Sequence, residues 1–199
     1  MATGNLRRAL PLIVFVAGLL VLGGAILLQL RGGADAPAPS TVGGPFTMTD
    51  HNGRTVTEKD FLGAPTLIFF GFTHCPDVCP TTLFEVSEVL RAADSQADGV
   101  RVLFVTVDPE RDTPALLRDY LGSFDSRIIG LSGDRAQTDA IIKAFKVYAK
   151  KVPTGDAPDD YTMDHTAIVY LMDKQGRFVG AFDLKRPPEA AARDLISRL

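Results

Sequence analysis

The chain is poor in the side chains that carry most metal and redox chemistry. Its 199 residues include two cysteines, three histidines and no tryptophan. Two cysteines are too few for a small fold that depends on several disulfides, and alone they cannot supply the four ligands of an iron–sulfur centre. A closed structural zinc site would have to recruit histidines as well. The formal net charge is −3 and there is no basic stripe, so the chain also lacks the signature of nucleic-acid binding.

Charge is missing from Ala9 to Leu30, and this absence predicts a membrane anchor. Those 22 residues would span roughly 33 Å as a helix, enough to cross the hydrocarbon core of a bilayer. A cleaved signal peptide is the alternative, but its apolar region should be shorter. The Ala-x-Ala site at 34–36 is also followed by proline. No cysteine follows the segment, which argues against a lipoprotein anchor.

Arg7 and Arg8 precede the apolar segment, so the positive-inside rule places residues 1–8 in the cytoplasm. The predicted location is a bacterial inner membrane crossed once, with the C-terminal domain in the periplasm. In a mitochondrion the equivalent is the inner membrane, with the domain facing the intermembrane space. Residues 31–45 are rich in glycine, proline and alanine, which predicts a flexible linker. The domain itself is expected to occupy residues 46–199.

The domain is predicted to alternate strands with helices, which favours an α/β fold whose central sheet is largely parallel and covered on both faces. Asn52-Gly53 marks a hairpin at its start. The expected strands are 66–70, 100–107, 128–131, 166–172 and 177–182, and the expected helices are 81–93, one that begins near Pro114, 135–145 and 188–199. The polar segment 149–160, with two prolines and a glycine, is expected to be a long loop.

Both cysteines lie in FGFTHCPDVCPTTL, residues 70–83, between a predicted buried strand and a predicted helix. A structural disulfide, a redox couple and a metal site are all compatible with this pair. A disulfide between Cys75 and Cys79 would close a very small loop and would therefore stabilise little. The start of a helix favours thiolate over thiol, and the thiolate is both the redox nucleophile and the metal ligand. The three intervening residues leave redox chemistry open and also allow two thiolates to face one ion.

Two thiolates and one imidazole would suit a three-coordinate Cu(I) site, because soft sulfur ligands select Cu(I). His51 lies in the predicted hairpin turn and is interpreted as a solvated turn residue. His74 adjoins Cys75, and because neighbouring side chains diverge we expect it to tune the thiolate or contact a partner. His165 lies on another element, from which it can approach the cysteine loop, so it is the favoured third ligand.

Three segments together resemble the Sco/SenC family of copper proteins. They are FGFTHCPDVCP (70–80), VTVDPERDTP (105–114) and DYTMDHTAIVYLMDKQGRF (160–178), and they occur in the order that the family has. The resemblance covers residues 42–199. It implies a thioredoxin-like fold, with a mixed central sheet, helices on both faces and an N-terminal β-hairpin, behind an N-terminal transmembrane helix.

The resemblance also implies a set of site residues. The family's two metal-binding cysteines fall on Cys75 and Cys79, and its distant histidine falls on His165. This implies that the three residues bind Cu(I) and Cu(II), and that the oxidised protein forms a Cys75–Cys79 disulfide. In thioredoxin-like proteins the loop before the corresponding strand packs against the cysteine motif, and His165 stands near that position.

Four other residues of these segments are candidates for supporting roles. They are His74, Asp77, Asp108 and Asp164. We hypothesise that they support the ligands or help to dock a partner. For Asp108 and Asp164 the alternative is that they cap their loops.

The function that the resemblance implies is delivery of copper to the binuclear copper site of cytochrome c oxidase subunit II, by a membrane-anchored metallochaperone. A copper donor and a thiol reductant would be further partners, and the sequence identifies neither. Copper transfer by ligand exchange turns over no substrate, so the chain is not expected to be an enzyme. One alternative is a thiol–disulfide oxidoreductase that reduces the cysteines of the same copper site, and another is a copper or redox sensor. A peroxidase is disfavoured, because residues 78–81 resemble the peroxiredoxin string but the upstream threonine is missing.

Overall fold

The computed structural model describes residues 14–25 and 41–198. Residues 14–25 are helical and lie inside the predicted anchor 9–30, whose other residues are outside the described part of the chain. No helix among the described residues is long and apolar enough to cross a membrane. Residues 1–8 and most of the predicted linker 31–45 are likewise outside the described ranges. The folded domain is described by itself.

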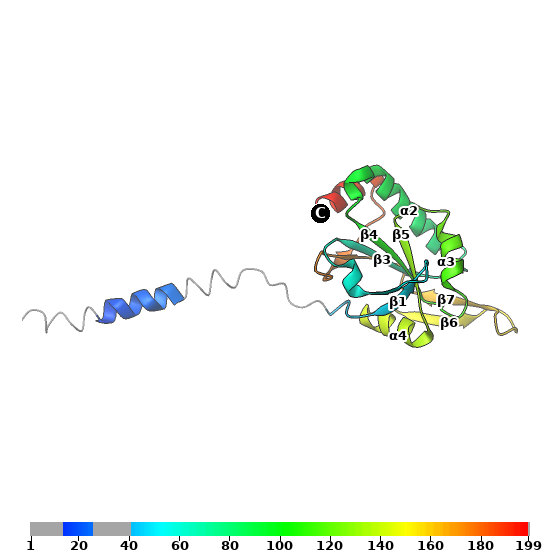
Figure 1. Ribbon diagram of the computed structural model, residues 1–199, viewed down its shortest axis with the longest axis horizontal. Helices are drawn as coiled ribbons and strands as arrows, with labels where there is room; N and C mark the ends of the chain where they lie inside the picture. The colour runs from blue at the N-terminus through cyan, green and yellow to red at the C-terminus, as the bar shows by residue number, and fades with distance from the viewer. Residues whose placement is uncertain (1–13, 26–40, 199) are drawn as a thin grey trace, which may run out of the picture. The chain divides into compact units, whose positions relative to one another are not determined.

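A seven-stranded mixed sheet forms the centre of the domain, in the order β2-β1-β5-β4-β3-β8-β9 (Figure 1). Strands β3, β4 and β5 are paired in parallel, and the outer pairings are antiparallel. These strands are β1 (Thr47–Asp50), β2 (Thr55–Thr57), β3 (Thr66–Gly71), β4 (Arg101–Thr106), β5 (Ile128–Ser132), β8 (Val169–Met172) and β9 (Phe178–Ala181). Two more strands, β6 (Ala149–Pro153) and β7 (Tyr161–His165), form a separate antiparallel sheet of two strands.

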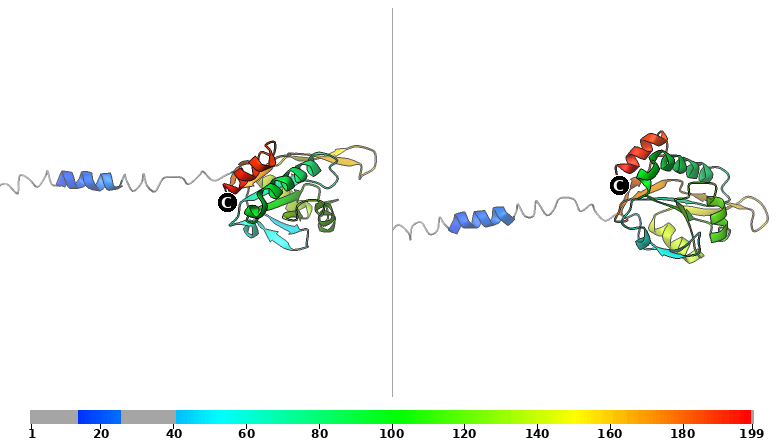
Figure 2. Two further views of the ribbon diagram at one scale, coloured as in Figure 1. Left: turned by 90° about the horizontal axis from the view of Figure 1, so that it is seen from above. Right: turned by 45° about the horizontal axis from the view of Figure 1, so that its top comes forward.

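Helices cover both faces of the main sheet. Helices α2 (Val78–Ala93) and α5 (Pro188–Ile196) lie side by side over one face, and α4 (Arg135–Ala144) lies on the other side (Figure 2). Helix α3 (Pro114–Leu121) contacts β5, and two short 3₁₀ helices, η1 (Glu58–Phe61) and η2 (Asp94–Ala97), connect the larger elements. The predicted α/β architecture with a mixed sheet is confirmed. The expectation that this sheet is largely parallel was wrong, because only two of its six pairings, β3–β4 and β4–β5, are parallel.

The central strands β3 and β4 determine where a site can form. Every residue of β3 is buried, and so is every residue of β4 after the first, as expected for strands covered on both faces. The two strands are parallel, with Gly71 opposite Thr106, so they end side by side. The loops that follow them therefore meet at one edge of the sheet, which is the usual place for chemistry in such folds.

The segment 149–160 contains a strand, and the prediction of a long loop was wrong. Strand β6 pairs with β7, with Ala149 opposite His165. Because β6 is exposed along almost its whole length, its sequence lacks the apolar alternation that predicts a strand. His165 is the last residue of β7. Residues 166–168 separate it from β8, whereas the predicted strand 166–172 would have begun directly after it. The other predicted strands and helices are confirmed, with bounds that differ by up to three residues at each end.

Candidate metal centre

Three potential ligand atoms meet at this edge of the sheet. Cys75 lies in the loop between β3 and α2, Cys79 lies in the first turn of α2, and His165 ends β7. The two sulfur atoms and one ring nitrogen all lie within 4.8 Å of one another. The distance between Cys79 Sγ and His165 Nε2 is 3.7 Å. The structure thus brings together the three residues that the sequence singled out as ligands.

A short loop fixes the two cysteines in different surroundings. The backbone N–H of Cys75 donates to the carbonyl of Phe72 at 3.3 Å, and the backbone N–H of Cys79 donates to Cys75 Sγ at 3.4 Å. Both cysteines are free thiols. Cys79 is fully buried, whereas Cys75 is partly exposed. Cys75 is therefore the sulfur that another molecule can reach first.

Burial raises the pKa of the Cys79 thiol well above its usual value, and the nearby Cys75 sulfur raises it further. The sequence led us to expect that the start of the helix would favour thiolate at both cysteines. At Cys79 this expectation is not met, because the loss of solvent outweighs the favourable backbone groups. The free Cys79 thiol accordingly keeps its proton at neutral pH, and a soft metal ion that binds there must displace that proton.

His165 presents one ring nitrogen to the cysteines. Its Nδ1 lies 3.0 Å from the carbonyl oxygen of Thr166, and because a carbonyl only accepts, Nδ1 carries the proton and Nε2 keeps its lone pair. The ring packs edge-on against Phe69 and Phe72, with centroid distances of 6.4 and 5.8 Å. Burial lowers the pKa of His165, which favours the neutral imidazole that binds metals. A hydrogen bond at the second nitrogen is the usual way to orient such a ligand.

The other two histidines do not belong to this group of ligand atoms. His74 is about half exposed, and its Nδ1 lies 3.1 Å from Thr73 Oγ1. His51 is not the solvated turn residue that the sequence predicted. Its Nδ1 accepts a 2.8 Å hydrogen bond from the backbone N–H of Gly130, and its carbonyl accepts two from Arg118. His51 thus links the hairpin turn to β5 and α3.

The three candidate aspartates lie in different environments. Asp77 and Asp164 are exposed, and Asp77 stands at the start of α2 without a capping hydrogen bond from its side chain. Asp108 is fully buried. Its carboxylate accepts hydrogen bonds from Arg111 Nε at 2.5 Å and from the hydroxyl of Tyr161 at 2.8 Å. Asp108 is therefore more than a cap for its own loop, because it also holds a residue of β7.

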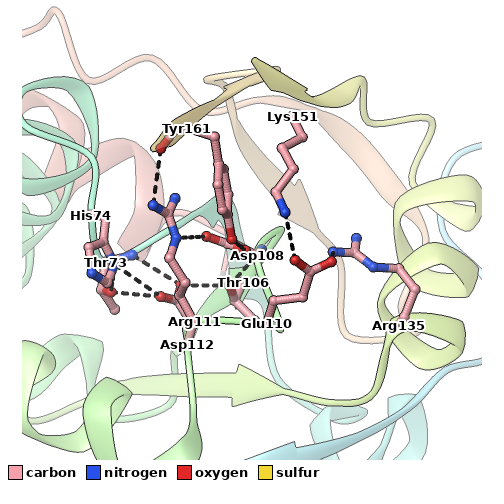
Figure 3. Close-up of polar contacts among 10 residues, drawn as sticks. All are labelled: Thr73, His74, Thr106, Asp108, Glu110, Arg111, Asp112, Arg135, Lys151 and Tyr161. Carbon is pink, nitrogen blue, oxygen red and sulfur yellow. Dashed lines mark hydrogen bonds and ion pairs between the residues drawn. The ribbon is translucent and has the colours of Figure 1, made fainter. Parts of the chain in front are cut away.

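Sequence reasoning missed a second buried carboxyl group beside the site. Asp112 accepts hydrogen bonds from the backbone and the hydroxyl of Thr73, and from the hydroxyl of Thr106 (Figure 3). Burial raises the pKa of Asp112, although these hydrogen bonds oppose the shift. The available signal was the spacing of Asp108 and Asp112 in VTVDPERDTP, directly after a buried strand. Only the first of the two was selected as a candidate.

The donor set fits a soft metal ion. Two sulfur atoms and one imidazole nitrogen provide the ligand types that Cu(I) prefers. Zinc would require a fourth ligand, and no further histidine, cysteine or carboxylate of the described residues joins this group. The same pair of thiols could form a disulfide on oxidation, because Cys75 Sγ already touches the backbone of Cys79. This geometry is compatible with both metal binding and thiol redox chemistry.

Comparison with known proteins agrees with the motifs. The family model SCO1/SenC matches residues 34–199. The human protein SCO1 homolog, mitochondrial, is 42% identical over 154 residues, which cover 76% of this chain and 51% of the human protein. The chain thus spans about half the length of that relative.

Two solved structures have the same fold. Bradyrhizobium japonicum ScoI with copper bound is 62% identical with a TM-score of 0.77, and the match covers 79% of this chain and 99% of that one. Yeast Sco1 with copper bound is 36% identical with a TM-score of 0.73, over 80% of this chain and 88% of that one. Because the family model covers most of the sequence and these relatives span the whole domain, the chain belongs to the SCO1/SenC family.

Proposed function

We propose that the chain is a membrane-anchored copper-binding protein that delivers copper to the binuclear copper site of subunit II during assembly of cytochrome c oxidase. The observation that supports this most directly is the convergence of Cys75, Cys79 and His165 within 4.8 Å. Two similar proteins have been solved with copper bound. The donor set suits Cu(I), and the imidazole also gives Cu(II) a nitrogen ligand.

Copper is the cargo in this proposal, and the site is built to accept it and release it. Each thiol gives up its proton when the ion binds. Because Cys79 is buried and Cys75 is partly exposed, an acceptor thiolate would approach on the Cys75 side and bind copper before the donor ligands leave. The metal passes from one set of ligands to the next without oxidation or reduction.

The proposed topology places residues 9–30 in the membrane and residues 1–8 in the cytoplasm. Residues 31–45 then form a linker, and the domain of residues 46–199 works in the periplasm, or in the intermembrane space of a mitochondrion. Support comes from the uncharged run and from the two arginines that precede it. A linker of this composition would allow the domain to reach an acceptor in the same membrane.

A thiol–disulfide oxidoreductase that reduces the cysteines of the acceptor site is the second candidate. The observation that favours it is the contact between Cys75 Sγ and the backbone of Cys79, in a loop where Cys75 is partly exposed. An exposed thiol can attack a disulfide, and a neighbouring thiol can then resolve the mixed disulfide. In this reaction His165 would have no direct part. A copper or redox sensor would use the same residues to alter a protein contact.

Replacing His165 by alanine tests the proposed function. The affinity for Cu(I) should fall by at least about tenfold, because losing a ligand should cost no less than losing a ligand's hydrogen-bond partner. The affinity for Cu(II) should fall more, since Cu(II) favours nitrogen ligands. The reduction potential of the Cys75–Cys79 pair should change much less. Competition with Cu(I) and Cu(II) chelators measures the two affinities, and titration with a dithiol buffer measures the reduction potential.

His74→Ala is the control for this experiment, because it removes a histidine that adjoins Cys75 but lies outside the ligand group. It should lower both copper affinities by much less than His165→Ala does, because it removes no ligand. Equal copper binding by the His165→Ala variant and the unchanged protein would rule out the three-ligand site. If His165→Ala supports oxidase assembly and Cys75→Ser does not, the oxidoreductase is favoured.

A further inference from the structure

The loop Asp108–Asp112, which follows β4, contacts the two segments that carry the ligand group. Its two aspartates are fully buried, and Figure 3 shows their side chains among residues from the cysteine loop and from the β6–β7 sheet. One half of the ligand group, Cys75 and Cys79, is attached to β3 and α2. The other half, His165, is attached to β7. These two strands, β3 and β7, belong to different sheets. The main ladder reaches His165 only through the connection to β8, which begins at Val169.

The histidine half depends on side-chain contacts at the start of β7. Tyr161 begins the strand that His165 ends, and four residues of extended chain span about 13 Å. Strand β7 pairs with β6 in a separate two-stranded sheet. The position of the start of β7 therefore depends on how Tyr161 and its neighbours pack on the domain.

Asp108 and Arg111 contact Tyr161 at three points and are also paired with each other. The Tyr161 hydroxyl donates to Asp108 Oδ1 at 2.8 Å, and Arg111 Nη1 donates to the Tyr161 carbonyl at 3.0 Å. The Arg111 guanidinium lies 3.7 Å from the centre of the Tyr161 ring, and its Nε donates to Asp108 Oδ2 at 2.5 Å. Both ends of the tyrosine, its backbone and its hydroxyl, are therefore fixed to the same loop (Figure 3).

The other side of the ring carries a second cation. Lys151 Nζ, from β6, lies 3.7 Å from the centre of the Tyr161 ring and forms an ion pair with Glu110 at 2.7 Å. Glu110 also pairs with Arg135 at 3.0 Å. Figure 3 shows the ring between the two cations. The loop Asp108–Asp112 thus attaches to both strands of the small sheet.

Arg111 leaves one of its hydrogen-bond donors without a partner. Its Nη2 is buried and has no hydrogen-bond partner, which is uncommon for a buried donor. The other two nitrogens of the guanidinium are used on Asp108 and on the Tyr161 carbonyl. The bond to the Tyr161 carbonyl connects the guanidinium to the start of β7.

The cysteine half is held by the other end of the same loop. Asp112 accepts from the Thr73 backbone at 3.0 Å and from the Thr73 hydroxyl at 2.6 Å. Thr73 lies two residues before Cys75. Asp112 also accepts from the Thr106 hydroxyl at 2.6 Å, at the end of β4. The cysteine loop is thereby fixed to the strand from which the loop Asp108–Asp112 emerges.

We propose that Asp108, Arg111 and Tyr161 are positioning residues that set His165 against the cysteines, and that Asp112 is the positioning residue for the cysteine loop. This inference rests on the proposed function, because it assigns these residues to the same copper site. None of the four touches the ion. They act through the ligands, and the loop determines the distance between the two halves.

Arg111→Gln in the full-length chain tests the histidine half. It should lower the Cu(I) affinity by about tenfold, the lower end of what loss of a ligand's supporting partner costs. The nitrogen hyperfine splitting in the electron paramagnetic resonance spectrum of the Cu(II) form should also change. In a His165→Ala background, Arg111→Gln should change the Cu(I) affinity by less than about twofold. This is the deviation usually seen between sites that do not interact. An equal loss in both backgrounds would overturn the proposal, because Arg111 would then not act through His165.

Arg127→Gln is the matched control. Arg127 is also a partly buried arginine, and it holds Asp125 with bonds of 2.9 and 2.7 Å, close to η2 and away from the ligands. This variant should lose stability in thermal unfolding and keep its Cu(I) affinity. If Arg127→Gln and Arg111→Gln lower the affinity alike, general destabilisation explains the result and the proposal fails. Should Arg111→Gln not fold, Tyr161→Phe removes one hydroxyl from the cluster and should show the same dependence on His165.

Asp112→Asn separates the two halves. Its effect on Cu(I) affinity should be the same with and without His165, because it acts on the cysteine loop. Dependence on His165 like that of Arg111→Gln would overturn the division of roles.

The metal-free protein offers a readout that does not require copper binding. The imidazole proton resonances of His165 should shift in Arg111→Gln and not in Arg127→Gln, and unchanged resonances would refute the proposal even if copper binding itself were confirmed.

Discussion

Replacing Cys79 by serine should lower the Cu(I) affinity by more than about 100-fold, because losing even a partner of a ligand costs about 10- to 100-fold. Serine has almost the same shape, so the packing of α2 on β3 should survive. Its hydroxyl is a poor ligand for a soft ion, and such an ion does not displace the hydroxyl proton at neutral pH. Copper competition on the full-length chain, with thermal unfolding measured in parallel, gives the result.

Cys75→Ser is the companion variant and should show a similar loss. A Cys79→Ser variant that binds Cu(I) as tightly as the unchanged protein would exclude Cys79 as a ligand. The cysteine variants alone cannot separate a chaperone from an oxidoreductase, because both functions need both thiols. The His165→Ala variant supplies that separation, since only the metal site depends on the imidazole.

Gly71→Ala should produce the largest loss of stability of any single methyl addition considered. Gly71 ends β3, and a Cβ at this position would lie 2.7 Å from Phe104 Cε2 and 2.8 Å from Cys79 Sγ. Both neighbours are fully buried, so neither can move freely. Overpacking of this kind typically costs about 1–3 kcal/mol. Chemical denaturation should show that loss, and the Cu(I) affinity should fall because the sulfur of Cys79 is pushed away from its position.

Gly180→Ala is the matched control, since it also adds a methyl group to a strand glycine. A Cβ at Gly180, in β9, would meet nothing within 4 Å. This variant should keep both its stability and its copper affinity. If Gly71→Ala is as stable as Gly180→Ala, the close approach of Cys79 to the end of β3 is not present in solution.

The main sheet could be predicted because its central strands are apolar throughout. A short apolar run such as 66–70 predicts a strand buried on both faces, and Asn52-Gly53 predicts a hairpin turn. Strand β6 could not be predicted in this way. Its residues face solvent, and the strand forms because its backbone pairs with that of β7. A pairing that depends on a partner distant in sequence leaves no local pattern.

The ligands were easier to predict than their environment. Cys75 and Cys79 are the only cysteines, and His165 was favoured because it lies on a separate element. The buried state of Cys79 was not foreseen, since the first turn of a helix is usually near solvent. Here Cys79 is fully buried against Gly71 at the end of β3. The pKa of Cys79 therefore rises, although the sequence led us to expect it to fall. Asp112 and Arg111 were missed for a similar reason, because their partners come from three different elements.

The separation of β7 from the main sheet has a consequence for how the domain opens. The seven-stranded sheet is a continuous ladder, whereas β6 and β7 form only a two-stranded one, and small units of this kind exchange their amide protons at lower free-energy cost than a core sheet. The β6–β7 unit is therefore expected to unfold locally while β3, α2 and the cysteines stay in place. Each such opening would withdraw the imidazole and leave copper on two thiolates, so the lifetime of the third bond would be governed by the stability of this small sheet and not by that of the whole domain.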